Sequence, residues 1–335
     1  MPAQIPSLFK FTPAVRNYVW GGRALLSLTS AGATADDVPI AEVWSIHADN
    51  RVADGPFAGW TLAQLTAQYP AEVLGANSIE TETARFPLLI KLLDCANWLS
   101  LQVHPNDRIA RQLEGPQFVG KTEAWHILDA RHDSQLIAGI KPGAPLEKLH
   151  AAIGNAAILD LTERHHVQPN DTVYMPAGTI HALGPGLLVY EVQQTSDLTY
   201  RVFDWDRPQA NGRALHIEKS IAAINPDLQG RIIRWKDAGN VAPLIQCPYF
   251  LLEIISAPVQ RDTHKRSFHA LTVTEGQALV STLKGAITLR QFDTVLVPAS
   301  CESYQLEGNF RILCSSAPGG WDEESTQGDH RAYAE

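Results

Sequence analysis

The segment PNDTVYMPAGTIHALGPGLLVYEVQQTSDLTYRVFDWDR, residues 169–207, determines the predicted fold of this chain. Its polar and apolar residues alternate with the period of two that is typical of strands. Pro176 and Gly178 indicate a tight turn, because proline fixes φ and glycine tolerates a positive φ. We therefore predict short strands at 173–175, from His181 onward, at 187–193 and at 199–203.

Three polar side chains lie within these predicted strands. His181 follows the turn, Glu191 is at mid-strand, and Arg201 stands between Tyr200 and Val202. A lone histidine after a turn is most often an ordinary histidine. A carboxylate or a guanidinium among apolar neighbours is buried only when it is paired or used. The three residues are therefore candidates for a functional site, whereas Arg207 and Arg213 are expected at the surface.

An earlier segment, LSLQVH at 99–104, has one apolar and one polar face. Ser100, Gln102 and His104 share the polar face, because side chains two apart in a strand point the same way. The simplest interpretation is that this face contacts water. A site is the alternative, and the residues of this segment alone leave both open.

Two further segments carry charged residues on predicted strands. Lys121 and Glu123 lie together in GKTEAWHIL at 120–128, and Lys91 interrupts the apolar strand 86–93. A lysine and a glutamate two apart on a strand most often form a solvated edge pair, which stabilises little. The pair is a candidate for the functional site only if the sheet brings it near the polar residues described above.

Composition limits the possible classes. The 335 residues are 45% hydrophobic and 19% charged, which predicts a soluble globular protein large enough for two domains. No run of 18 apolar residues and no signal peptide is seen, so we expect no membrane span and a cytoplasmic protein. A net charge of −9 argues against a nucleic-acid partner.

The four cysteines share no metal-binding spacing, and without a secretion signal we expect them to be reduced. A pairing of Cys301 with Cys314 is the less favoured alternative. The cysteines are Cys95, Cys247, Cys301 and Cys314.

The C-terminal part repeats the pattern of the opening segment. FDTVLVPA at 292–299 resembles NDTVYMPA at 170–177, and short strands with turn residues between them follow one another from Pro243 onward. We predict a mainly β fold of two related barrels with a few short helices at 60–74, 107–113, 145–153 and 217–224. Residues 1–240 would form the N-terminal domain with the metal and catalytic site. Residues 241–318 would form a second barrel with an apolar interior and no metal, and 319–335 a disordered tail.

The polar faces together offer a metal-ligand set. Gln102, His104, Glu123 and His181 supply two imidazoles, a carboxylate and an amide oxygen, which suit Zn²⁺ and are also tolerated by non-haem iron. Thiolate ligands are missing from the set, so a structural zinc site of the cysteine type is not favoured. Such ligands leave room for water or substrate oxygens, as a catalytic site requires.

These segments carry a family resemblance. FPLLIK, LSLQVHPND, GKTEAWHIL, DTVYMPAGTIHALG and YEVQQTSDLTYRVFDWDR resemble type I mannose-6-phosphate isomerase in its shorter, two-cupin bacterial form. The resemblance extends from about Phe9 to Pro318, and the order QVHP, KTE, PAGTIHA is highly specific. It implies two cupin (jelly-roll) barrels, one Zn²⁺ per chain, and interconversion of mannose 6-phosphate and fructose 6-phosphate through an enediol(ate).

The resemblance also implies site residues. Zinc ligands would be Gln102, His104, Glu123 and His181; catalytic positions Arg201, Lys121, Glu191 and Asp197; and substrate-binding positions near the phosphate Ser100 and Lys91. Two departures from the family stand out. Asn170 replaces a turn glycine, which asparagine can do because it tolerates positive φ. His126 replaces a common tyrosine and should face away from the metal.

Two other classes remain as alternatives. An iron-dependent cupin dioxygenase would use His104, Glu123 and His181 as a facial triad, but it does not explain Arg201 and two lysines. A non-catalytic sugar-phosphate-binding cupin is possible because fold does not fix function, although the retained ligand set argues against it. The expected partner is a small sugar phosphate, with no nucleic acid and no membrane, and the expected state is a monomer or a weak homodimer.

Overall fold

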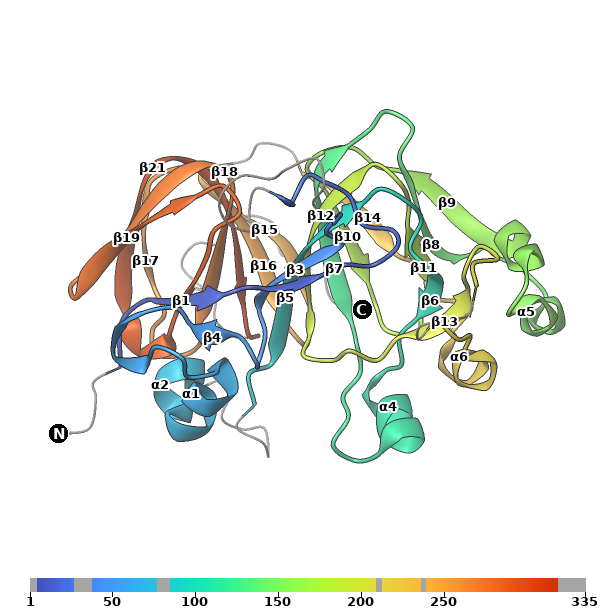
Figure 1. Ribbon diagram of the computed structural model, residues 1–335, viewed down its shortest axis with the longest axis horizontal. Helices are drawn as coiled ribbons and strands as arrows, with labels where there is room; N and C mark the ends of the chain where they lie inside the picture. Colours follow the sequence, from blue (N-terminus) through green and yellow to red (C-terminus); the bar gives the residue numbers. More distant parts are fainter. Residues whose placement is uncertain (1–4, 27–37, 77–84, 209–212, 236–238, 319–335) are drawn as a thin grey trace. The chain divides into compact units, whose positions relative to one another are not determined.

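The computed structural model describes residues 5–26, 38–76, 85–208, 213–235 and 239–318 (Figure 1). The fold is mainly β, with 44% strand and 17% helix, as predicted. The chain groups into two compact units. Unit 1 is Met1–Ala14, Trp44–Ile90 and Lys236–Glu335, and unit 2 is Val15–Val43 and Lys91–Trp235. The sequence predicts an N-terminal domain of residues 1–240, whereas in the structure residues 5–14 and 44–90 group with the C-terminal strands. The predicted tail 319–335 lies outside the described residues.

Two sheets position the candidate site. The seven-stranded sheet has the order β14-β10-β7-β12-β5-β3-β2, and the five-stranded sheet has the order β13-β6-β11-β8-β9. The first contains β14 Arg231–Arg234, β10 Asp171–Met175, β7 Glu123–Ala130, β12 Leu187–Gln194, β5 Leu88–Cys95, β3 Glu42–Ile46 and β2 Ala14–Arg16. The second contains β13 Tyr200–Phe203, β6 Leu101–Val103, β11 His181–Leu183, β8 Gln135–Ile140 and β9 Thr162–His166.

Alternation in the five-stranded sheet separates core residues from site residues. Leu101, Val103, Tyr200 and Val202 belong to one buried apolar cluster. Burial of such a side chain stabilises the fold by about 1.5–3 kcal/mol. The apolar cluster therefore fixes the strand faces, and the residues between its members must point to the other side.

Short helices lie beside this sheet. α4 Asp107–Glu114 contacts α6 Ile217–Ala223, and α6 lies against β13 and β6 (Figure 1). α5 Leu146–Ala152 is followed by the 3-10 helix η3 Ala156–Leu161. All three predicted helices in this region are confirmed. Asn106 caps α4, since its side chain accepts from the Ile109 N–H at 3.0 Å.

The helix predicted at 60–74 is two helices in the structure. α1 spans Leu62–Gln68 and α2 spans Pro70–Leu74. Thr61 caps α1 as expected and forms a reciprocal capping box with Gln64. The break falls at Tyr69, because Pro70 disfavours the helical conformation of the residue before it and has no N–H to donate.

Unit 1 contains a nine-stranded antiparallel sheet with the main order β15-β16-β21-β18-β20-β1-β4. β17 pairs with β21, and β19 pairs with β18. The 3-10 helix η4 Ala299–Cys301 follows β20, and η2 Gly55–Phe57 follows β4. The strands are β15 Val241–Gln246, β16 Leu251–Ile255, β21 Ser303–Ser316, β18 His269–Thr282, β20 Thr294–Val297, β1 Phe9–Thr12, β4 Arg51–Val52, β17 Val259–Asp262 and β19 Gly285–Arg290.

The predicted internal repeat is visible in the backbone. Asn170 and Phe292, which occupy matching positions, both have positive φ, at 73° and 69°. The next residue makes the same bond in each copy: Asp171 Oδ2 accepts from the Gln168 N–H at 3.0 Å, and Asp293 Oδ2 accepts from the Arg290 N–H at 2.9 Å. Asparagine thus meets the demand for positive φ that the sequence indicated at position 170.

Strand register extends the repeat to neighbouring strands. Met175 pairs with Glu123, and the matching Val297 pairs with His269. His269 therefore stands where Glu123 stands in unit 2. Its Nδ1 lies 2.8 Å from the hydroxyl of Tyr304.

A buried ion pair adjoins that histidine. Arg261, the strand partner of Tyr304, pairs with Glu253, with Nη2 and Oε2 2.6 Å apart. The second barrel has a buried apolar cluster as predicted, but its interior also holds this ion pair and is therefore not wholly apolar. The polar residues are tolerated there because each finds a partner, which removes the penalty of burying an unpaired polar group.

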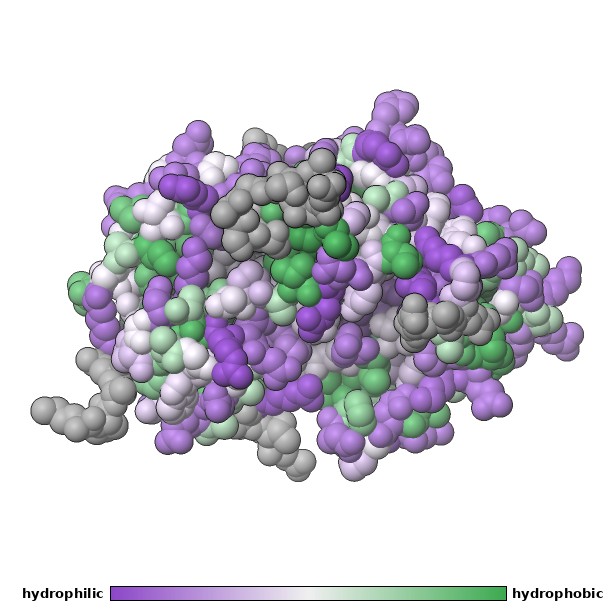
Figure 2. All heavy atoms as spheres, in the orientation of Figure 1, coloured by the Kyte–Doolittle hydropathy of each residue, from purple (hydrophilic) through white to green (hydrophobic). Residues whose placement is uncertain are grey.

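On the face shown in Figure 2, hydrophilic and hydrophobic residues are interspersed, with the hydrophobic ones in small groups. Such mixing is normal for a folded domain. In the part of the chain that the structure describes, no helix is long and apolar enough to cross a membrane. Cys95, Cys247, Cys301 and Cys314 are all free thiols.

Candidate active site

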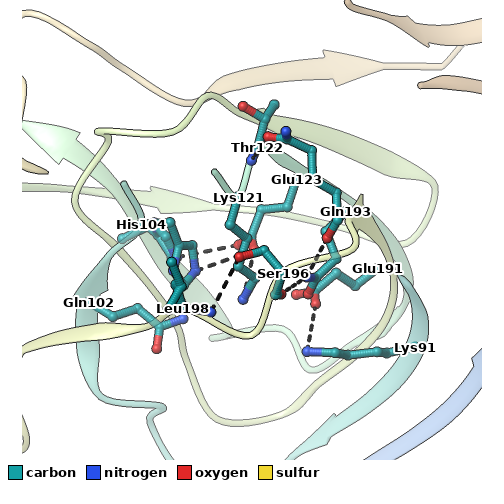
Figure 3. A network of polar contacts seen from close by, with 12 residues as sticks. Lys91, Gln102, His104, Lys121, Thr122, Glu123, Glu191, Gln193, Ser196 and Leu198 are labelled. Carbon is teal, nitrogen blue, oxygen red and sulfur yellow. Dashed lines mark hydrogen bonds and ion pairs between the residues drawn. The ribbon is translucent and has the colours of Figure 1, made fainter. Parts of the chain in front are cut away.

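Three buried side chains, of His104, Glu123 and His181, converge in unit 2. Figure 3 shows His104 and Glu123 side by side. His104 follows β6, Glu123 opens β7 and His181 opens β11. His104 Nε2 lies 3.4 Å from Glu123 Oε2, and His181 Nε2 lies 3.3 Å from Glu123 Oε1. The three ligand atoms all lie within 4.8 Å of one another. This spacing suits a single metal ion held by two imidazoles and a carboxylate.

Backbone carbonyls orient both imidazoles. His104 Nδ1 lies 2.8 Å from the carbonyl oxygen of Leu198, and His181 Nδ1 lies 2.8 Å from that of Thr179. Since a carbonyl only accepts, each Nδ1 carries the proton and each Nε2 presents its lone pair towards Glu123. Metal-ligating histidines are typically oriented in this way.

The buried polar atoms at the centre fit a cation. His104 Nε2 and both carboxylate oxygens of Glu123 are buried and have no hydrogen-bond partner among the described residues. Unpaired polar atoms in the interior are unfavourable by about 1–3 kcal/mol each. A positive ion between them would remove this penalty, so the donor set fits the metal that the sequence pattern implied.

The electrostatics favour the protonation state that binds metal. Burial, with the nearby Lys121, lowers the pKa of His104 to about 3, and burial lowers the pKa of His181. Burial alone would raise the pKa of Glu123, but Lys121, His104 and His181 together hold it well below its usual range. The imidazoles are therefore neutral and the carboxylate is ionised at neutral pH, which is the state that metal binding requires.

The fourth predicted ligand lies beside these three. Gln102 pairs with His181 across β6 and β11, and its Nε2 is 3.3 Å from His181 Nε2. Its Oε1 accepts a hydrogen bond from Ser100 Oγ at 3.4 Å. The amide nitrogen, rather than the expected oxygen, thus faces the cluster. A half-turn of the amide group exchanges the two atoms and presents the oxygen.

A cavity of about 340 Å³ in unit 2 adjoins this cluster. Gln102 and Lys121 belong to its wall, and Lys121 Nζ lies 3.3 Å from Glu123 Oε2. The structure brings seven of the predicted site residues to the cavity wall. The other three, His104, Glu123 and His181, form the buried group beside it, called the metal cluster below. The seven are Lys91, Ser100, Gln102, Lys121, Glu191, Asp197 and Arg201.

Lys91 and Glu191 are joined in a buried ion pair at this wall. Lys91 Nζ lies 3.3 Å from Glu191 Oε1 and 3.5 Å from Glu42 Oε2 (Figure 3). Trp125 Nε1 donates to Glu191 Oε2 at 3.1 Å. Burial lowers the pKa of Lys91, but Glu42 and Glu191 outweigh it and the pKa is raised. Burial raises the pKa of Glu191, and Lys91 opposes that rise. The charge of Lys91 is therefore largely committed to carboxylates.

Arg201 reaches the cavity from β13. Its neighbours Tyr200 and Val202 are buried in the apolar cluster, as the alternation predicted. Arg201 Nη1 donates to the carbonyl oxygen of Ala214 at 3.0 Å. Asp197 is exposed at the mouth, in the loop between β12 and β13.

The sequence prediction missed several residues of the cavity wall, among them Arg213, His216 and Glu42. Arg213 was expected at the surface, but its side chain is only 14% exposed and lines the cavity. His216 also lines it. Both follow β13 in irregular chain, where no periodic pattern indicates the direction of a side chain. Glu42 was missed as well, because a buried strand gave no reason to pair it with Lys91.

The side chains of His126 on β7 and of Thr122, directly before β7, lie on the face opposite that of Glu123. His126 Nδ1 lies 2.9 Å from Thr172 Oγ1, and Thr122 Oγ1 accepts from the Ala177 N–H at 3.2 Å. His126 therefore points away from the metal cluster, as expected from alternation.

Comparison with known proteins gives consistent matches. Residues 8–136 match the family described as phosphomannose isomerase type I, catalytic domain. Mannose-6-phosphate isomerase ManA of Bacillus subtilis is 33% identical over 316 residues, which cover 91% of this chain and 97% of the relative. The Streptococcus mutans mannose-6-phosphate isomerase is 30% identical, covering 89% and 94%.

Solved structures agree with these matches. The Bacillus subtilis mannose 6-phosphate isomerase has a TM-score of 0.81 at 31% identity and covers 92% of this chain and 99% of that one. A putative mannosephosphate isomerase of Archaeoglobus fulgidus shares the fold, with a TM-score of 0.75 at 22% identity, covering 94% and 99%. The predicted cupin-type fold and the predicted enzyme class are confirmed. The chain belongs to the type I mannose-6-phosphate isomerase family, a family of aldose–ketose isomerases.

Proposed function

We propose that this protein is a zinc-dependent isomerase that interconverts mannose 6-phosphate and fructose 6-phosphate through an enediol(ate). The single observation that carries the proposal is the buried cluster of His104, Glu123 and His181 beside a cavity lined by Arg201 and Lys121. Within this cluster, His104 Nε2 and both carboxylate oxygens of Glu123 lack hydrogen bonds. The activity named for the full-length relatives supports the choice of substrate.

His104, Glu123 and His181 would hold the metal, with Gln102 as a fourth ligand after rotation of its amide. Two neutral imidazoles, one carboxylate and one amide suit Zn²⁺. When bound, the cation supplies Lewis-acid polarisation of the sugar oxygens.

The chain itself would move the proton between C2 and C1. Glu191 is a buried carboxylate in the cavity wall, held in place by Trp125 and Lys91. Its raised pKa brings it closer to neutral pH, where a carboxylate best takes up and returns a proton. Asp197, at the exposed mouth of the same cavity, would admit and orient the sugar.

Arg201 would stabilise the negative charge that develops on the oxygens of the enediolate. It lines the cavity and is the strand partner of Gln102, which supports a contact with the substrate. A guanidinium remains charged at all working pH values, and fixed charges aimed at a developing oxyanion lower the barrier. Lys121, paired with Glu123, adds positive charge to the same wall.

We also propose a cytoplasmic location, which the four free thiols support because reducing compartments keep cysteines unpaired.

The test is the metal content of the purified protein measured together with turnover of mannose 6-phosphate. We expect one zinc per chain and isomerisation that stops on chelation and returns with zinc. Iron content with oxygen consumption would favour the dioxygenase instead. Binding of the sugar phosphate by the zinc-loaded protein without turnover would favour the non-catalytic binding protein.

A further inference from the structure

The charges around the cavity are unevenly distributed. On the side of the metal cluster, Lys91 and Lys121 face three carboxylates, those of Glu42, Glu123 and Glu191. Two positive charges against three negative ones leave that side with one negative charge, and a divalent metal would make it only weakly positive. The net charge of this side is therefore close to zero, and it attracts a phosphate dianion only weakly.

The other side of the cavity carries excess positive charge. Arg201 and Arg213 line it, and the buried carboxylate of Asp204 pairs with both Arg213 and Arg207. Arg207 is outside the cavity wall and balances the charge of Asp204. Arg201 and Arg213 thus leave two positive charges at the wall, of which Asp197 at the mouth offsets one, on a chain whose net charge is −9. Positive charge concentrated in a cavity of an acidic protein favours binding of a small anion.

Asp204 holds Arg213 in a fixed orientation. Arg213 Nε donates to Asp204 Oδ2 at 2.6 Å, and Nη2 donates to Oδ1. This pair uses two of the five N–H donors of the guanidinium and leaves three for another acceptor. Asp204 is itself buried, which limits its movement. The arginine is thus ordered before a ligand arrives, and less entropy is lost when one binds.

His216 provides a second donor at the same side. Its backbone N–H donates to the carbonyl oxygen of Arg201 at 2.9 Å, and its Nδ1 accepts from the Arg201 N–H at 3.0 Å. Because Nδ1 accepts, the ring proton of the neutral imidazole resides on Nε2. The residue lines the cavity, so Nε2–H is available as a donor without a charged imidazole.

Resting on the proposed function, we infer that Arg213 and His216 bind the phosphate group of the substrate and that Asp204 positions Arg213 for this contact. The planar guanidinium matches a phosphate with two parallel N–H donors. Lys91 and Ser100, the positions that the resemblance assigned near the phosphate, are instead engaged with carboxylates and with Gln102. Arg201 is the strand partner of Gln102 and is left for the sugar, so sugar chemistry and phosphate recognition use different arginines.

The experiment compares Arg213→Ala with Arg207→Ala in the zinc-loaded enzyme. Both arginines pair with Asp204, but only Arg213 lines the cavity. We expect Arg213→Ala to raise KM for mannose 6-phosphate at least tenfold while kcat changes little, because a phosphate contact is made equally in the ground and transition states. Arg207→Ala should leave KM within about twofold by the same reasoning.

A second measurement is independent of turnover. Calorimetric titration with inorganic phosphate should show binding to the wild-type holoenzyme that weakens at least tenfold in Arg213→Ala. Arg213→Gln, which removes the charge but keeps a polar side chain with an N–H donor, serves if the alanine variant does not fold. Asp204→Asn should weaken phosphate binding although Arg213 is retained, since the amide no longer accepts from both guanidinium nitrogens.

The outcomes separate this inference from the proposed function. A wild-type enzyme that binds phosphate through Arg213 but does not isomerise mannose 6-phosphate would overturn the function and support the phosphate site. An active wild-type enzyme whose KM and phosphate affinity are the same in Arg213→Ala, or change equally in Arg207→Ala, would overturn the phosphate site alone.

Discussion

Replacing Lys91 by methionine should destabilise the protein strongly and in a pH-dependent manner. Lys91 Nζ lies between the buried carboxylates of Glu42 and Glu191, at 3.5 and 3.3 Å. Methionine fills the volume of the lysine stem but leaves two buried negative charges facing each other. Removal of one partner of a buried ion pair costs about 3–5 kcal/mol. We therefore expect a loss of that size in the free energy of unfolding at pH 7.5.

The sign of the pH dependence follows from the carboxylates. Burial already raises the pKa of Glu191, and without Lys91 that pKa rises further above its unfolded value of about 4.3. The folded variant then binds more protons than the unfolded chain between the two pKa values. The loss of stability should be smallest near pH 4.5 and should grow as the pH rises through the folded pKa.

Urea unfolding of the metal-free proteins, followed by circular dichroism at pH 7.5 and pH 5, measures this loss. Lys10→Met is the control, because the Lys10–Asp293 pair is partly exposed and contributes less than about 1 kcal/mol. A loss in Lys91→Met below about 1 kcal/mol at pH 7.5, or an equal loss at both pH values, would refute the assignment of Lys91 as the counter-charge of two buried carboxylates.

Three further predictions concern the metal, Arg201 and unit 1. His104→Ala and His181→Ala should each lose zinc and activity while keeping the β spectrum, and full zinc in either variant by elemental analysis would contradict the ligand assignment. Arg201→Ala should lower kcat roughly a hundredfold, and Arg201→Lys should restore only part of the lost kcat, because an ammonium lacks the planar geometry of a guanidinium. Steady-state kinetics that show a raised KM with unchanged kcat would instead assign Arg201 to substrate binding. Arg261→Met should lower the urea midpoint of unit 1, with a loss of about 3–5 kcal/mol since Glu253 stays buried, and the prediction fails if Arg261→Met and wild type unfold together.

Local patterns were sufficient for the strands and for the metal cluster. Alternation in 99–104 and in 120–128 put Gln102, His104 and Glu123 on the polar faces that the structure also shows. The matching motifs NDTVYMPA and FDTVLVPA predicted a repeat that the paired turns at Asn170 and Phe292 confirm. These features depend on neighbours within one strand or turn, where the direction of a side chain follows from sequence period alone.

The tertiary structure alone decided which charges meet. Arg213 was expected at the surface but lines the cavity, because its side chain forms an ion pair with the buried Asp204. It belongs to an irregular segment, where sequence period does not indicate the direction of a side chain. Arg261 and Glu253 form an ion pair inside a barrel that alternation marked as apolar. Pairing across strands that are far apart in sequence sets these contacts, and a charged side chain is stable in the interior only when that pairing supplies its partner. The sequence by itself determined the fold, the family and the cluster of His104, Glu123 and His181. The charge partners that line the cavity are set only by the tertiary structure.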